Sequence, residues 1–205
     1  MIWGIGTGRC GTKSLSKHLN GLHEPEPWPL HRAAYHARLI SSQEDEQELR
    51  AILKKRIDLG APAVVDLHQS FCLDVIEEID PKAEFAFIAR NPAACISSFL
   101  TGGGFTDRDV FGEYKAQPIG GFHNESRLQR VVFHWVYTNE LIYTHLMRTR
   151  RPFKCWRTED MGEIRENAYP PHLKTDFTKD EAAYIVDETC HLWATLREFI
   201  HVHHA

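Results

Sequence analysis

The sequence predicts an α/β protein, a three-layer α/β/α domain around a central, mainly parallel sheet of four or five strands. Two observations support this prediction. Four short apolar runs, rich in β-branched and aromatic residues, have the composition of buried strands, and segments with helical periodicity separate them. Strands that alternate with helices are typical of βαβ units, in which helices cover both faces of a parallel sheet.

The composition fits one such domain. The chain has 205 residues, 42% of them hydrophobic and 25% charged, and no repeat or linker divides it, so we expect a single domain over residues 1–205. A net charge of -4 disfavours nucleic acid as a partner. No apolar run is long enough for a membrane span, and the five widely spaced cysteines favour reduced thiols, so we expect a cytoplasmic protein.

The strand candidates are residues 2–5, 63–67, 84–89 and 153–157. The helix candidates are residues 13–22, 45–59, 70–79, 92–100, 125–150 and a C-terminal helix over about 179–201. Glycines and a proline between residues 101 and 124 predict a long, flexible loop, and loops of that length are usually functional or disordered. We expect surface connections at residues 24–29 and around 169–171.

A glycine-rich turn joins the first strand to the first helix, with the sequence Gly6-Thr7-Gly8-Arg9-Cys10-Gly11-Thr12-Lys13-Ser14. Backbone N–H groups in such a turn can converge on an anion. Arg9 and Lys13 add cationic donors, and the hydroxyls of Thr12 and Ser14 can complete the cradle. A Walker A motif starting at Gly6 would need lysine at position 12, so Lys13 is one residue late. We expect a P-loop-NTPase-like phosphate site, the alternative being a tight turn without a ligand.

Two more candidate sites follow predicted strands. Arg90 ends the third strand and Ser98 lies eight positions later, where both could hold one anion; Ser97 is an alternative to Ser98. His68 lies just beyond the second strand, at the edge where open parallel sheets bind ligands, and can act as a general base near neutral pH. Asp66 points to the same side and could be the base itself or orient His68. Purely structural roles for these side chains remain open.

These segments resemble the sulfotransferases that use 3′-phosphoadenosine 5′-phosphosulfate (PAPS). The loop of that family reads Arg or Lys, Ser or Thr, Gly, Thr, then Thr or Ser, and the matching segment here is Arg9-Cys10-Gly11-Thr12-Lys13. The spacing of Arg90 and Ser98 is similar to the family's pair for the 3′-phosphate, and His68 matches its catalytic histidine. The segment Trp156 to Met161 looks like its closing Tyr-Glu-Asp-Leu motif. The resemblance covers Ile2 to about Met161.

The chain also departs from that family. Cys10 and Lys13 replace two hydroxyl residues, and the late basic loop and the aromatic stack on adenine are not evident. The candidates for the missing cation are Arg148, Arg150, Arg151 and Lys174.

The resemblance implies transfer of a sulfuryl group from PAPS to an acceptor hydroxyl or amine, with 3′-phosphoadenosine 5′-phosphate (PAP) as product and no metal. The implied catalytic residues are His68, Arg9, Lys13 and Asp66. The implied cofactor-binding residues are Gly8, Arg9, Cys10, Gly11, Thr12, Lys13, Ser14, Arg90 and Ser98. The resemblance does not identify the acceptor, which could be a small molecule or a glycan. It also leaves the oligomeric state undetermined, and a homodimer is one possibility.

Two other functions are compatible with the sequence. In a P-loop nucleotide kinase or nucleotidase using Mg-ATP, Lys13 and Ser14 would act as a displaced Walker pair and Asp66 would help to hold Mg²⁺. The second of these functions is that of a nucleotide-binding protein which has the same fold but no catalytic activity.

Overall fold

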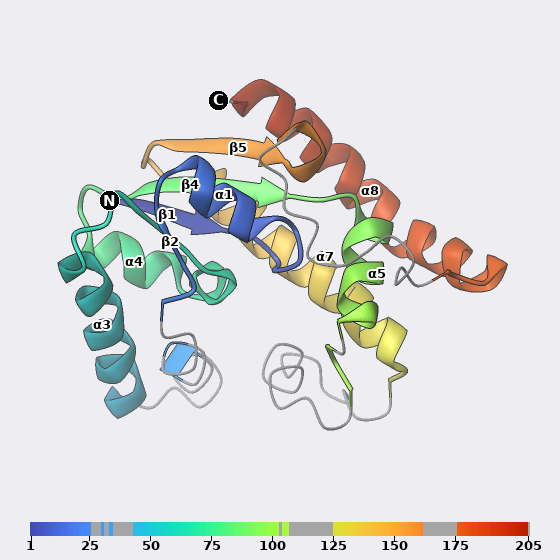
Figure 1. The fold of residues 1–205 in the computed structure, drawn as a ribbon, viewed down its shortest axis with the longest axis horizontal. Coiled ribbons are helices and arrows are strands. Elements are labelled where there is room, and N and C mark those ends of the chain that lie inside the picture. The colour runs from blue at the N-terminus through green and yellow to red at the C-terminus, as the bar shows by residue number, and fades with distance from the viewer. Residues whose placement is uncertain are drawn as a thin grey trace.

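The computed structural model describes residues 1–25, 30, 33–34, 43–102, 104–106, 125–161 and 176–204. These residues form a sheet of five strands, all parallel, in the order β2-β3-β1-β4-β5 (Figure 1). The strands are β1 (Ile2–Ile5), β2 (Leu22–His23), β3 (Ala63–Val65), β4 (Glu84–Ala89) and β5 (Phe153–Arg157). The predicted three-layer α/β/α class is confirmed, whereas β2 was not predicted.

All six predicted helices are present, with shifted ends. They are α1 (Thr12–His18), α3 (Gln43–Asp58), α4 (Leu73–Ile79), α5 (Pro92–Thr101), α7 (Arg127–Leu146) and α8 (Lys179–His203), and two short 3-10 helices are η1 (Leu67–Phe71) and η3 (Thr158–Asp160). The strand predicted over residues 63–67 ends at Val65, because Asp66 accepts a hydrogen bond from the His68 N–H and starts η1. Most of the loop predicted at residues 101–124, and the connection around 169–171, lie outside the described residues.

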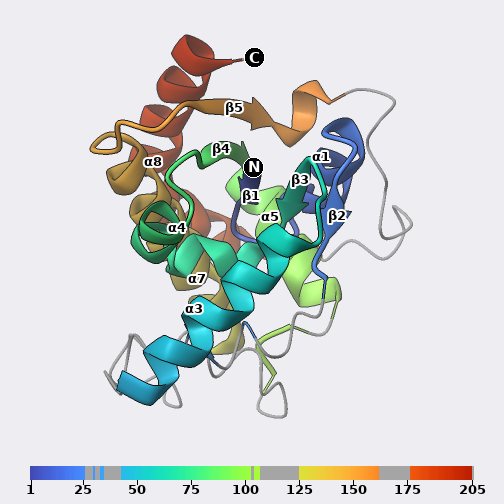
Figure 2. The same ribbon diagram turned by 90° about the vertical axis from the view of Figure 1, so that its left-hand side faces the viewer.

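The helices cover the two faces of the sheet unequally. From β1 the chain moves outward to the edge strand β2 and then returns across β1 to β4 and β5. Right-handed crossovers therefore place α1 on one face and the helices of the returning half, α3, α4, α5 and α7, on the other (Figure 2). The last helix, α8, packs against α7, α5 and β5.

The central strand β1 pairs with β3 on one side and with β4 on the other. Its side chains Trp3 and Ile5 are fully buried, as are Phe85 and Phe87 of β4. The loop after β1 consequently lies between the ends of β3 and β4, at the carboxyl edge of the sheet where ligands of open α/β folds bind.

The five cysteines are free thiols, as the sequence predicted; the structure shows four of them buried and Cys190 exposed. In the part of the chain that the structure describes, no helix is both long and apolar enough to cross a membrane.

Candidate phosphate-binding and acid–base site

The loop between β1 and α1 is folded tightly by three residues in the left-handed region: Gly8 at φ +76°, Arg9 at φ +50° and Gly11 at φ +97°. A Cβ on Gly8 would lie 2.9 Å from a methyl group of Leu67, so a side chain there would be both strained and crowded. Arg9 adopts a conformation that is uncommon for a residue other than glycine, and such conformations persist only where surrounding contacts hold them.

Those contacts are hydrogen bonds to five consecutive carbonyl groups of the loop, each from a different part of the fold. The donors are Ser70 Oγ to Gly6 (3.0 Å), His134 Nε2 to Thr7 (2.8 Å), Cys95 Sγ to Gly8 (3.4 Å), Arg90 Nη1 to Arg9 (3.0 Å) and Thr158 Oγ1 to Cys10. In a planar trans peptide the carbonyl and the next N–H point in opposite directions. Each of these bonds therefore turns the N–H that follows the bound carbonyl, in residues 7–11, away from the donor of that bond.

The thiol of Cys10 accepts hydrogen bonds from some of these N–H groups. Burial raises the pKa of its thiol, while hydrogen bonds from the Thr7 hydroxyl and from the backbone N–H groups of Gly8 and Thr7 oppose the shift. Cys10 was predicted to bind the anion, but its side chain belongs to the hydrophobic core. Only its backbone could therefore contact an anion. An anion would meet the loop on the side of Arg9, Gly11 and Lys13, which keep solvent exposure.

The two hydroxyls predicted to complete the cradle lie in different surroundings. Thr12, the first residue of α1, is nearly buried, and its Oγ1 lies 3.1 Å from Nε2 of His23. Ser14 is buried as well. Of these two hydroxyls, that of Thr12 contacts the imidazole of His23.

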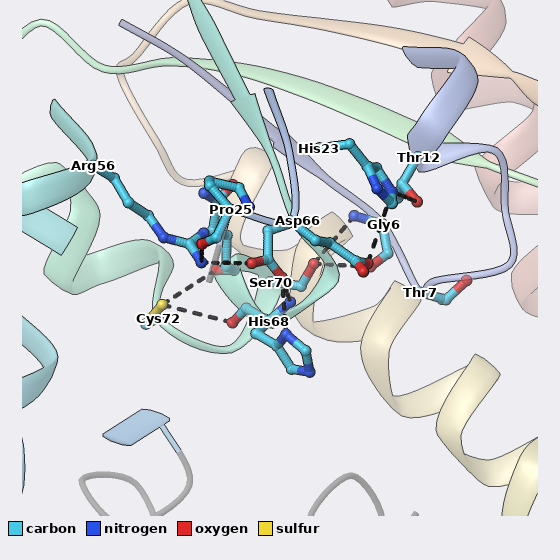
Figure 3. A network of polar contacts seen from close by, with 12 residues as sticks. Gly6, Thr7, Thr12, His23, Pro25, Arg56, Asp66, His68, Ser70 and Cys72 are labelled. Atoms are coloured by element: carbon cyan, nitrogen blue, oxygen red, sulfur yellow. Dashed lines mark hydrogen bonds and ion pairs between the residues drawn. The ribbon is translucent and has the colours of Figure 1, made fainter. Parts of the chain in front are cut away.

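At the end of β3 a buried chain of polar contacts joins Arg56, Asp66 and His68 (Figure 3). Asp66 Oδ2 accepts from Arg56 Nη2 at 2.7 Å, and Oδ1 accepts from the backbone N–H and from Nδ1 of His68, each at 2.8 Å. Since the ionised carboxylate only accepts hydrogen bonds, Nδ1 of His68 carries the hydrogen. In the neutral imidazole Nε2 is then the basic nitrogen, as a general base requires.

The charge of Asp66 follows from its neighbours. Burial alone would raise the pKa of this carboxyl, but the contacts with His68 and with the Arg56 guanidinium outweigh it and hold the pKa well below its ordinary value of 3.8. Asp66 is thus an anion at neutral pH. Its position favours the second of its two predicted roles, because both carboxylate oxygens already hold His68 and Arg56.

Arg90 lies on the opposite side of the loop, at the end of β4. Nη1 of Arg90 donates to the Arg9 carbonyl at 3.0 Å, and the backbone carbonyl of Arg90 accepts a hydrogen bond from Nε1 of Trp135 at 3.3 Å. Its Nε is buried and, among the described residues, has no hydrogen-bond partner. Ser98 is half-buried on α5, and within the described residues no hydrogen bond joins it to Arg90.

The segment after β5 has a structural role. Arg157 pairs with Asp160 at 2.7 Å, Glu159 accepts from the Asn91 N–H at 3.1 Å, and Thr158 binds the Cys10 carbonyl. This segment therefore ties the end of β5 to the loop and to the start of α5.

Sequence reasoning missed four residues of this site: His23, Arg56, His134 and Thr158. Thr158 lies in the segment that looks like the closing Tyr-Glu-Asp-Leu motif but was given no role there, and the other three belong to no recognisable motif. Arg56 sits in a strongly charged helix, where an arginine is usually exposed, and only the structure shows that it is buried beside Asp66.

Comparison with protein-family models, with curated proteins and with solved structures finds no match in any of the three. The function therefore has to be argued from the fold and from the contacts of the site.

Proposed function

We propose that this chain is a PAPS-dependent sulfotransferase that moves a sulfuryl group to an acceptor hydroxyl or amine. The observation that supports it is the order of groups along the sheet edge: the Asp66–His68 pair follows β3, the loop follows β1, and Arg90 follows β4. Transfer between a phosphorylated donor and an acceptor needs an anion cradle with a base on one side and an anchor for the donor on the other.

His68 is the base in this proposal. Its Nε2 takes the proton of the acceptor as the acceptor oxygen or nitrogen bonds to sulfur and the bond from sulfur to the phosphate oxygen breaks. Asp66 holds Nδ1–H, so it orients the ring and stabilises the imidazolium that forms. His68 itself and, to a smaller extent, Arg56 keep Asp66 ionised.

The leaving group is PAP, whose bridging oxygen gains negative charge in the transition state. Arg9 and Lys13, with the N–H groups on their side of the loop, would stabilise that charge. Arg90, with Ser98, would bind the 3′-phosphate. These side chains supply positive charge and proton transfer, so the step as proposed requires no metal.

The free thiols suit a reducing compartment, so we place the reaction in the cytoplasm. A Mg-ATP kinase is less well supported, because both oxygens of Asp66, its candidate magnesium ligand, already accept hydrogen bonds from protein donors. The other alternative, a nucleotide-binding protein without activity, is distinguished from a sulfotransferase by the activity assay described below.

Binding is tested first, by thermal unfolding with PAP and, separately, with Mg-ATP. Ligand at about 100 times Kd adds about 2.7 kcal/mol, which raises the midpoint of a chain of this size by roughly 5 to 10 °C. We expect PAP to raise it, Arg90→Ala to abolish the shift, and Arg197→Ala, which removes an exposed arginine of α8, to retain it. A shift with Mg-ATP alone would contradict the proposal.

Activity is tested by transfer of radiolabelled sulfate from PAPS to a panel of phenols, sugars, lipids and peptides. Arg9→Ala should lose roughly 2 to 4 kcal/mol of barrier stabilisation, or about 30- to 1,000-fold in rate. Binding of PAP without transfer to any acceptor would favour the non-catalytic alternative.

A further inference from the structure

His23 is held in place by the backbone around it. Strand β2 pairs with β3 so that Leu22 lies beside Val64 and His23 beside Val65, and the N–H of Glu24 donates to the Val65 carbonyl at 2.9 Å. This close pairing depends on Gly21, because a Cβ there would lie 2.5 Å from the Ala63 carbonyl oxygen. His23 therefore sits at a fixed point beside the candidate site.

That point is next to the loop. Helix α1 runs back along the sheet from the loop, and β2 returns in the direction of β1, so His23 comes to lie near the first residue of α1. Figure 3 shows His23 with its ring against Thr12, and His23 Nε2 lies 3.1 Å from Thr12 Oγ1. A side chain from an edge strand thus contacts a hydroxyl of the predicted phosphate loop.

The direction of this hydrogen bond decides what Thr12 can offer an anion. If Nε2 carries no hydrogen, the Thr12 hydroxyl donates to it and presents only lone pairs to a ligand. If Nε2 carries the hydrogen, it donates to Thr12 Oγ1 and leaves the hydroxyl hydrogen able to turn to a phosphate. The Glu24 carboxylate, with Oε1 at 3.8 Å from Nε2, favours a hydrogen on that nitrogen.

We propose that His23 is a positioning residue which, by donating from Nε2 to Thr12 Oγ1, directs the Thr12 hydroxyl at the phosphate bound in the loop. This inference rests on the proposed function, because it assumes that the loop binds the phosphate of PAP or PAPS. His23 itself touches neither the cofactor nor the acceptor; it acts through Thr12.

The test is the affinity for PAP, measured by calorimetry, of the wild type and of Thr12→Val, His23→Leu, His23→Gln and the double variant Thr12→Val/His23→Leu. We expect Thr12→Val and His23→Leu each to weaken binding by about three- to tenfold, the range of one hydrogen bond. The amide N–H of glutamine can replace Nε2–H, so His23→Gln should stay within about twofold of the wild type. The double variant should be about as weak as either single one, because both remove the same interaction.

Each other outcome has a definite meaning. His23→Gln as weak as His23→Leu, or additive losses in the double variant, would overturn the role of His23 while the proposed function stands. A wild type that does not bind PAP would overturn the proposed function and this inference with it. If His23→Leu unfolds at a lower temperature without ligand, Thr12→Ser and His23→Gln supply the comparison, and Thr12→Ser must retain binding.

Discussion

Replacement of Asp66 by asparagine tests the buried chain of contacts behind His68. The carboxylate accepts three hydrogen bonds, at 2.7 Å from Arg56 and twice at 2.8 Å from His68, and it is wholly buried. An asparagine has one oxygen and one NH₂ group, so at least one of these contacts would bring two donors together. It also leaves the guanidinium of Arg56, only 3% exposed, without its counter-charge.

We expect Asp66→Asn to lower the free energy of unfolding by about 3 to 5 kcal/mol, the usual effect of breaking a buried ion pair. Since domains are stable by only about 5 to 15 kcal/mol, the variant should unfold at a clearly lower urea concentration. Transfer activity should fall by about 10²- to 10⁴-fold at temperatures where the variant is folded, because Nδ1 of His68 is no longer held with its hydrogen.

The matched control is Asp58→Asn, which removes an exposed carboxylate from the same helix as Arg56 and should change stability by less than about 0.5 kcal/mol. A second control adds Arg56→Met to Asp66→Asn. Removing both charges should restore part of the lost stability, because the unpaired guanidinium is gone, while activity stays low. A loss below about 1 kcal/mol for Asp66→Asn would refute the reasoning.

Two other predictions concern the loop and acid stability. His134→Leu leaves the Thr7 carbonyl buried without its donor, so the free energy of unfolding measured in urea should fall by about 1 to 3 kcal/mol and PAP should bind more weakly; unchanged values for both would contradict the assigned contact. The folded pKa of Asp66 is lowered, so its stabilising contribution is complete above its ordinary pKa of 3.8 and is lost as the pH falls below it. Urea midpoints between pH 7 and pH 3 should therefore decline more steeply in the wild type than in Asp66→Asn, and equal slopes would exclude Asp66 as a source of the decline.

Local chemistry in the sequence predicted much of the fold. Strands β1, β4 and β5 have the bounds that their apolar runs indicated, since burial on both faces of a parallel sheet requires such runs. Helix α5 begins at Pro92 as expected, with Asn91 as its N-cap. Strand β2 was missed because two residues contain no periodicity.

The candidate site could be predicted only in part. The spacing of the sequence placed the loop, His68 and Arg90 after successive strands, and the structure puts all three at one edge of the sheet. It did not indicate that the side chain of Cys10 faces the core, because that orientation depends on the left-handed turn at Gly8 and Arg9.

By itself, then, the sequence determined the α/β class and the residue types at the ends of the strands, because strand and helix formation depends on residues that are neighbours along the chain. Only the tertiary structure decided the strand order and the partners of those residues. The bonds that hold the loop carbonyls join residues 64 positions apart for Ser70 and Gly6, 127 for His134 and Thr7, and 148 for Thr158 and Cys10. Such pairs form only when the packing of helices on the sheet brings distant segments to one place, which no local pattern encodes.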